Sequence, residues 1–257
     1  IIAPSSIWIL FNKSIVPTVD LLNNIHIDEG AIINVYEAQQ LSLHGDLQSY
    51  DTRPQYYAQL VKTGLGVLEI AESTSSSRKV NISTFTIEEG GFRLDNNVVL
   101  GSDFSLNGND SYLEMAEGSG ITNKIDINSG NLIIYNESNI SSASVNFNNV
   151  STGTLSKLQI QSDCVLSSST LSNPINIAKG IEFVTDSTTT AFVDAFNFIA
   201  APDSIINKSG EGNFIFNTNN TDFVLSELGI NGGYFTLVNG SSMTVSSSAA
   251  VNGGILS

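Results

Sequence analysis

The sequence predicts an all-β protein that coils into one elongated β-solenoid, and three observations lead to this prediction. Apolar and polar residues alternate in short runs along the whole chain, and a bend centred on glycine recurs between pairs of runs. Only 14% of the residues are charged, against about 25% in an average globular domain. Asn, Ser, Thr and Gly take their place, and these residues favour strands and turns over helices.

The recurring bend has the form apolar-x-apolar-x-x-Gly-x-apolar-x-apolar. Clear copies span residues 85–94, 125–134 and 228–237, and two looser copies begin at 25–30 and 175–180. A chain that turns so tightly between strands needs a positive φ, which glycine adopts without a steric penalty. Alternate apolar residues before and after the bend then face the same interior.

The spacing of the bends predicts stacked turns of about 20 residues, because the glycines at 30, 90 and 130 lie 60 and 40 residues apart. A unit this short has one inward face and cannot close a core alone, so it must stack on its neighbours. An antiparallel sandwich or barrel is the alternative, since it also has many short strands. The solenoid is favoured because the Asn-Gly pairs lack the long flanking strands of hairpins.

Charge and cysteine content exclude several classes of function. The chain has 25 acidic and 10 basic residues, and the basic residues are scattered, so no basic stripe exists for nucleic acid. Cys164 is the single cysteine, which excludes an intrachain disulfide and a thiolate metal cluster. The chain begins at Ile1 without a signal peptide, so we expect an internal fragment of a longer protein.

A second motif, apolar-x-Lys-x-Gly-x-Gly-x-apolar-x-apolar, occurs at residues 60–70 and 206–216. Each copy is followed by a bend glycine, Gly90 or Gly233, so the full units cover 60–94 and 206–237. These units resemble the autotransporter-associated β-strand repeat, which is found in passenger domains of bacterial type V autotransporters.

The resemblance implies a single-stranded right-handed parallel β-helix, continuous over residues 1–257. It also implies an extracellular location, on the bacterial surface or released through the outer membrane, and a C-terminal outer-membrane β-barrel elsewhere in the full-length protein. The expected role is a rigid stalk or adhesin whose partner is a host cell-surface or matrix protein or a glycan. The alternative is a scaffold that carries a separate enzyme or toxin module outside this fragment.

No catalytic, cofactor or metal residues are predicted. The two histidines, His26 and His44, lie in no recognisable catalytic motif. Many right-handed β-helices are polysaccharide lyases or hydrolases, so the carboxylate pairs at 28–29 and 88–89 leave a carbohydrate-active enzyme as a less favoured alternative. Their place at bends favours solvated turns instead.

The segment 49–59 interrupts the repeat and contains three of the seven tyrosines. Tyrosine and arginine are favoured anchors of binding interfaces. We therefore expect Tyr50, Arg53, Tyr56 and Tyr57 to form a contact surface, the alternative being a loop that packs its rings against the solenoid.

Overall fold

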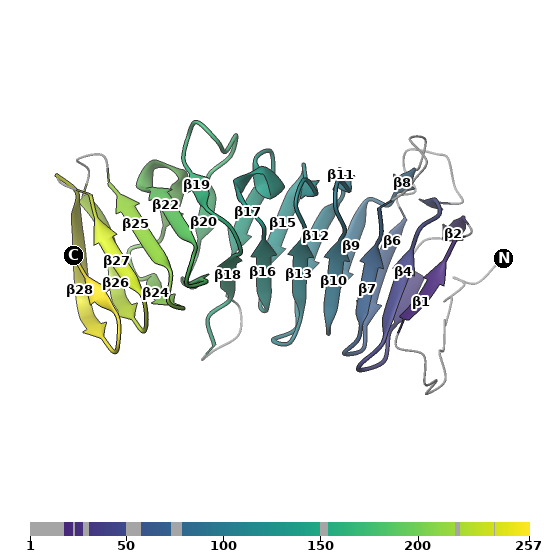
Figure 1. Cartoon of the computed structure of the whole chain (residues 1–257), viewed down its shortest axis with the longest axis horizontal. Helices are drawn as coiled ribbons and strands as arrows, with labels where there is room; N and C mark the ends of the chain where they lie inside the picture. The colour runs from purple at the N-terminus through teal and green to yellow at the C-terminus, as the bar shows by residue number, and fades with distance from the viewer. Residues whose placement is uncertain are drawn as a thin grey trace.

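The chain forms a parallel β-solenoid (Figure 1). The structure is a computed structural model that describes residues 18–22, 24–27, 31–49, 58–72, 79–149, 154–218, 222–238 and 240–257. Every strand pair in this part of the chain is parallel, and two short 3₁₀ helices, η1 (Glu137–Ile140) and η2 (Ala195–Asn197), are its only helices. The all-β solenoid prediction is confirmed and the antiparallel alternative is wrong. The right-handed sense of the coil stays a prediction.

Each turn of the solenoid has three sides. The first side is an 11-stranded sheet, called sheet 1. Its strands are β1 (Thr18–Leu21), β4 (Gln40–Leu43), β7 (Val67–Ile70), β10 (Gly91–Leu94), β13 (Tyr112–Met115), β16 (Asn131–Ile134), β18 (Lys157–Ile160), β21 (Gly180–Thr185), β24 (Ile205–Ser209), β26 (Asp222–Ile230) and β28 (Ser242–Val251).

Each strand of an eight-stranded sheet, called sheet 2, comes directly before a strand of sheet 1. It consists of β3 (Ala31–Asn34), β6 (Gln59–Thr63), β9 (Thr84–Ile87), β12 (Asp103–Leu106), β15 (Lys124–Ile127), β17 (Ser144–Phe147), β20 (Ile175–Ile177) and β23 (Phe198–Ala200).

The third side changes along the solenoid. It begins as a three-stranded sheet, β2 (Ile25–Ile27), β5 (Leu47–Ser49) and β8 (Val80–Asn81), and continues as β11 (Val99–Leu100) and β14 (Gly120–Ile121), followed by η1. It ends as a five-stranded sheet, called sheet 3: β19 (Cys164–Leu166), β22 (Thr190–Asp194), β25 (Asn213–Asn217), β27 (Tyr234–Leu237) and β29 (Ile255–Leu256).

The length of a turn varies more than the sequence predicts. Tyr112 pairs with Asn131, a separation of 131 − 112 = 19 residues, whereas Gln40 pairs with Val67, a separation of 67 − 40 = 27 residues. The strands stay short and in register, so the extra residues lie in the connections. The prediction of about 20 residues describes the shortest turns.

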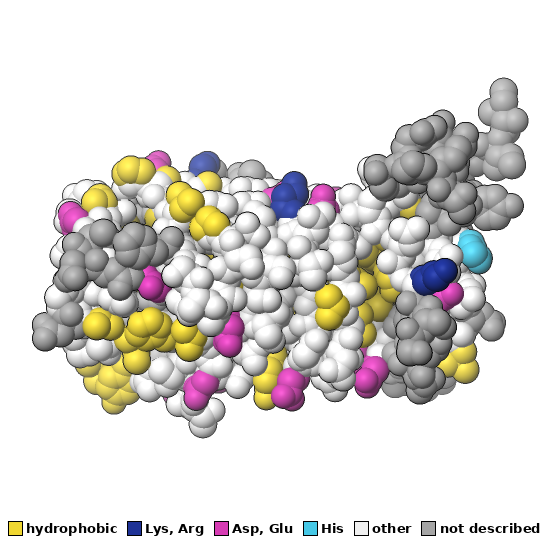
Figure 2. Space-filling view, turned by 90° about the horizontal axis from the view of Figure 1, so that it is seen from above, with side chains coloured by type: hydrophobic (Ala, Val, Ile, Leu, Met, Phe, Trp, Pro, Cys, Tyr) yellow, Lys and Arg dark blue, Asp and Glu magenta, His cyan; other side chains and the backbone are white. Residues whose placement is uncertain are grey.

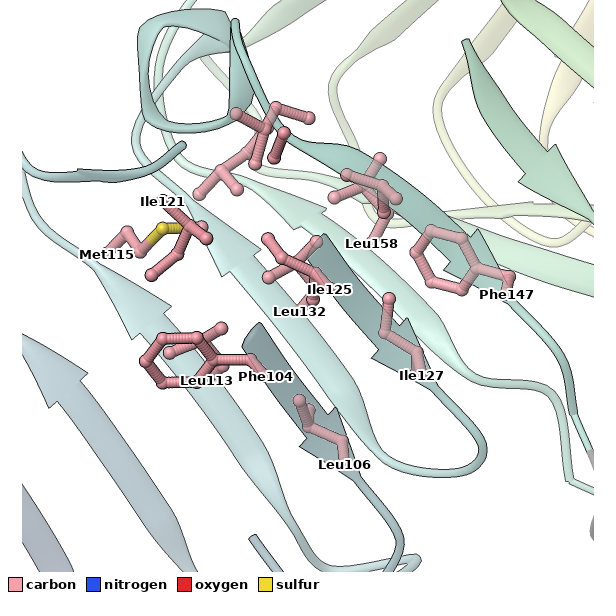
Figure 3. Close-up of a cluster of buried hydrophobic side chains, with 14 of the residues drawn as sticks. Phe104, Leu106, Leu113, Met115, Ile121, Ile125, Ile127, Leu132, Phe147 and Leu158 are labelled. Carbon is pink, nitrogen blue, oxygen red and sulfur yellow. The ribbon is translucent and has the colours of Figure 1, made fainter. Parts of the chain in front are cut away.

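Apolar side chains form continuous rows inside the solenoid, whereas charged side chains are scattered over its surface (Figure 2). One inward row of sheet 1 is fully buried and joins Leu41, Leu68, Phe92, Leu113, Leu132, Leu158 and Phe183. Figure 3 shows how such side chains from successive turns fill the space between the sides. Stacked turns therefore share one core, as expected of a repeat that cannot bury its apolar face alone.

The three clear bend motifs are corners of the solenoid. Gly90, Gly130 and Gly233 have φ values of 65°, 95° and 62°, as the sequence predicts. The looser copy at 175–180 is different, because Gly180 lies inside β21 without a positive φ. A Cβ there would lie 2.7 Å from the Ile205 carbonyl oxygen, so this glycine provides space rather than a bend. Gly30 lies outside the described residues.

Candidate functional site

Lys62 of the first Lys-x-Gly-x-Gly motif occupies a core position. In the ladder of sheet 2 it lies between Ile33 of β3 and Ile87 of β9, and its side chain is fully buried. The aliphatic stem therefore continues an apolar row. The ammonium group leaves the row at the corner and donates hydrogen bonds to the carbonyl oxygens of Thr63 (3.1 Å), Gly64 (2.5 Å) and Glu89 (2.8 Å).

Lys208 of the second motif makes the same arrangement. It lies between Phe183 of β21 and Ile230 of β26 and is also fully buried. Its ammonium group donates hydrogen bonds to the carbonyl oxygens of Ser209 (2.7 Å), Gly210 (2.8 Å) and Gly232 (3.2 Å). In both motifs two acceptors belong to the lysine's own corner and the third belongs to the corner of the next turn.

These lysine-capped corners explain the spacing of the glycines. Gly64 and Gly210 have φ values of 77° and 75°. A Cβ on Gly90 would lie 2.5 Å from the Gly64 oxygen, and one on Gly233 would lie 2.7 Å from the Gly210 oxygen. The glycine that closes each unit thus stacks directly on the corner of the preceding turn. An ammonium group has three donors, so each cap is fully satisfied and ties two turns together.

The two caps lie at different corners of the solenoid. Lys62 is followed by the turn from β6 in sheet 2 to β7 in sheet 1, whereas Lys208 is followed by the turn from β24 in sheet 1 to β25 in sheet 3. The units at 60–94 and 206–237 therefore form the same cap, but the second cap lies one side further along the turn than the first. The sequence alone does not reveal this shift.

Burial lowers the pKa of both lysines from 10.5 to about 8. The Glu89 carboxylate opposes the change at Lys62, and this carboxylate also accepts a hydrogen bond from the Gly64 amide at 3.2 Å. Both ammonium groups stay mostly protonated at neutral pH. The burial of the two lysines can be predicted from the sequence. Each lysine comes two positions after an inward residue, Leu60 or Ile206, and residues two apart on a strand face the same side.

The outward side of sheet 1 carries a charged network centred on Glu69. Its carboxylate accepts hydrogen bonds from Ser42 (2.6 Å) and Gln40 (2.7 Å), and the Arg93 guanidinium lies 3.6 Å away. Arg93 also approaches Glu114 at 4.0 Å. The Arg93 guanidinium lies between the Glu69 and Glu114 carboxylates, and the network connects four neighbouring strands, which indicates a structural role.

A ladder of polar side chains runs along the corner after sheet 2. Asn107 donates to Glu88 (3.0 Å), Asn128 donates to Asn107 (2.9 Å) and Asn148 donates to Asn128 (2.9 Å). Each step joins neighbouring turns. The carboxylate pair at 88–89 thus contributes to contacts between turns, because Glu88 accepts from Asn107 and Glu89 accepts from the Gly64 amide. Residues 28–29 lie outside the described residues.

The two histidines and the single cysteine lie in different parts of the solenoid. His26 points outward on β2, and His44 lies 3.5 Å from Asp20. Cys164 is a free, buried cysteine, and burial raises the pKa of its thiol, so a thiolate is disfavoured. Among the described residues no cluster of His, Cys, Asp and Glu could hold a metal ion, and no helix has the length and hydropathy of a membrane span.

The predicted contact surface lies outside the described residues, since Tyr50, Arg53, Tyr56 and Tyr57 all fall within 50–57. It stays a prediction.

Comparison of the chain with protein-family models, characterised proteins and solved structures finds no match.

Proposed function

We propose that this chain is a rigid stalk segment of an autotransporter-type passenger that is displayed on a bacterial surface. The lysine-capped corner carries the proposal, because the motif that resembles the autotransporter-associated repeat folds twice into the same cap. The continuous core supports the mechanical part, since stacked turns that share side-chain rows resist bending. A net charge of −15 keeps neighbouring stalks apart.

In this proposal the chain acts by binding and by holding binding surfaces away from the cell, without catalysis. The inward residues and the corners are committed to contacts between turns. Recognition of a host protein or glycan then belongs to outward faces and to inserted loops, such as the segment 49–59.

Surface display is tested on intact bacteria that produce the full-length protein. An antibody against residues 18–257 is expected to label intact cells, and external trypsin is expected to remove the label. An antibody against a cytoplasmic protein reports cell integrity. Labelling that appears only after permeabilisation would refute display, and unchanged adherence to host cells after gene deletion would refute the adhesive role.

A further inference from the structure

The outward face of sheet 3 carries fewer charged side chains than the outward face of sheet 1. Sheet 1 has outward Glu69, Arg93, Glu114, Lys157 and Glu182, and sheet 2 has outward Asp103, Lys124 and Asp126. Within the five strands of sheet 3 the one charged side chain is Asp194, at the end of β22. Figure 2 shows separate groups of exposed hydrophobic side chains on the side of the molecule seen from above.

Two outward rows cross sheet 3. In the first row Val165, Phe192, Ile215 and Thr236 are paired in register across β19, β22, β25 and β27. In the second row Thr190, Asn213, Tyr234 and Ile255 are paired across β22, β25, β27 and β29. Val165, Tyr234 and Ile255 are 41%, 47% and 50% exposed, so the face presents large apolar groups beside uncharged hydroxyl and amide groups.

A solvated face of a sheet normally carries polar side chains, and the largest apolar patch on a typical monomer, about 300–600 Å², is often functional. The size of the face restricts its occupant. Five strands of two to five residues span about 24 Å by 13 Å, on the order of 300 Å². A stable protein interface needs about 800 Å² on each partner, so a second copy or a folded protein is disfavoured.

The chemistry of the face restricts the occupant further. The exposed Tyr234 ring and the partly buried Phe192 ring can contact the C–H faces of sugar rings, while Thr190, Asn213 and Thr236 offer hydrogen-bonding groups to sugar hydroxyls. The face provides no cation for sulfate or carboxylate groups, and the chain as a whole is acidic. An extended peptide would bind at a sheet edge through backbone groups, which the interior of this face does not expose.

We propose that the outward face of sheet 3 binds a neutral polysaccharide chain, with Phe192 and Tyr234 as stacking platforms. The proposal deepens the proposed function, because it assigns the partner to the glycan class and places its site. The polymer lies across the strands, along the direction in which the outward rows run.

The test is affinity electrophoresis of purified 1–257 in gels that contain hydroxyethyl cellulose, α-mannan or dextran, with heparin as the anionic comparison. Wild type is expected to be retarded in at least one neutral gel and not by heparin. The double variant Phe192→Ser and Tyr234→Ser is expected to lose at least tenfold in affinity. Tyr112→Ser on sheet 1 is the matched control and is expected to bind as wild type does.

Thermal unfolding of each variant verifies that it is folded before binding is compared. The single variants Phe192→Ser and Tyr234→Ser replace the double variant if it fails to fold. Absence of retardation in all three neutral gels, retardation by heparin alone, or equal binding by wild type and the sheet 3 variants would overturn the proposal. These results are independent of cell labelling, so failure of glycan binding and failure of surface display are distinguished.

Discussion

Replacement of Gly90 by alanine tests the stacking of corners directly. Gly90 has a φ of 65°, and holding a side-chain-bearing residue there costs about 1–2 kcal/mol. The new Cβ would also lie 2.5 Å from the carbonyl oxygens of Gly64 and Gly66. These are backbone atoms of the preceding turn, so the corner must move, at a cost of about 1–3 kcal/mol.

The expected loss of stability for Gly90→Ala is therefore about 2–5 kcal/mol, measured by urea unfolding of the whole chain. Hydrogen exchange should be faster at the Gly91 amide, which donates to the Gly66 oxygen at 3.1 Å. Gly101→Ala is the matched control, because its Cβ would lie 3.7 Å from the nearest atom, the Thr122 hydroxyl oxygen. We expect this control to change stability by less than about 0.5 kcal/mol. Equal stability of the two variants would refute the stacked corner.

Two further predictions concern the core and the cap. Phe104→Ala should lower the free energy of unfolding by about 3–5 kcal/mol, because this buried ring stacks on Phe85 (ring centroids 4.9 Å apart) and meets Phe92 edge to face (5.3 Å). A loss below about 1 kcal/mol in urea unfolding would contradict the shared core. For Lys62, whose pKa falls from 10.5 to about 8 on folding, the unfolded chain holds more protons between these two pH values. The free energy of unfolding of wild type, relative to that of Lys62→Met, should therefore rise with pH through this window by up to about 3 kcal/mol. If this difference in free energy does not depend on pH, the hydrogen bonds to the three carbonyl groups cancel the effect of burial.

Much of the fold follows from the sequence because two local rules determine it. Alternation of apolar residues identifies inward side chains, so Phe85 and Ile87 or Leu132 and Ile134 are correctly assigned to the core. Glycine before a second apolar pair identifies a corner wherever the backbone needs a positive φ. The rule is wrong at Gly180 because glycine there makes room for a neighbouring turn, and sequence does not separate the two requirements.

The candidate site was harder to predict, because it depends on which residues become neighbours across turns. The motif marks Lys62 as important, but its acceptors include the Glu89 carbonyl, 27 residues away, and the length of that separation varies between turns. The apolar face of sheet 3 left a weaker signal. Runs such as Phe214-Ile215-Phe216 break the alternation, and the middle residue points outward.

The phase shift between the two caps shows that a cap does not depend on its position in the turn. A cap needs one inward lysine, one tight corner and one glycine in the following turn, and none of these depends on which side of the coil comes next. The motif therefore connects two neighbouring turns and is not restricted to one position in the repeat. Gly90 follows Gly66 by 24 residues and Gly233 follows Gly212 by 21 residues, so the same cap forms in turns of different length. The lysine caps need no outward side chain of the sheets, so the caps are compatible with the separate outward binding surfaces that we propose for the stalk.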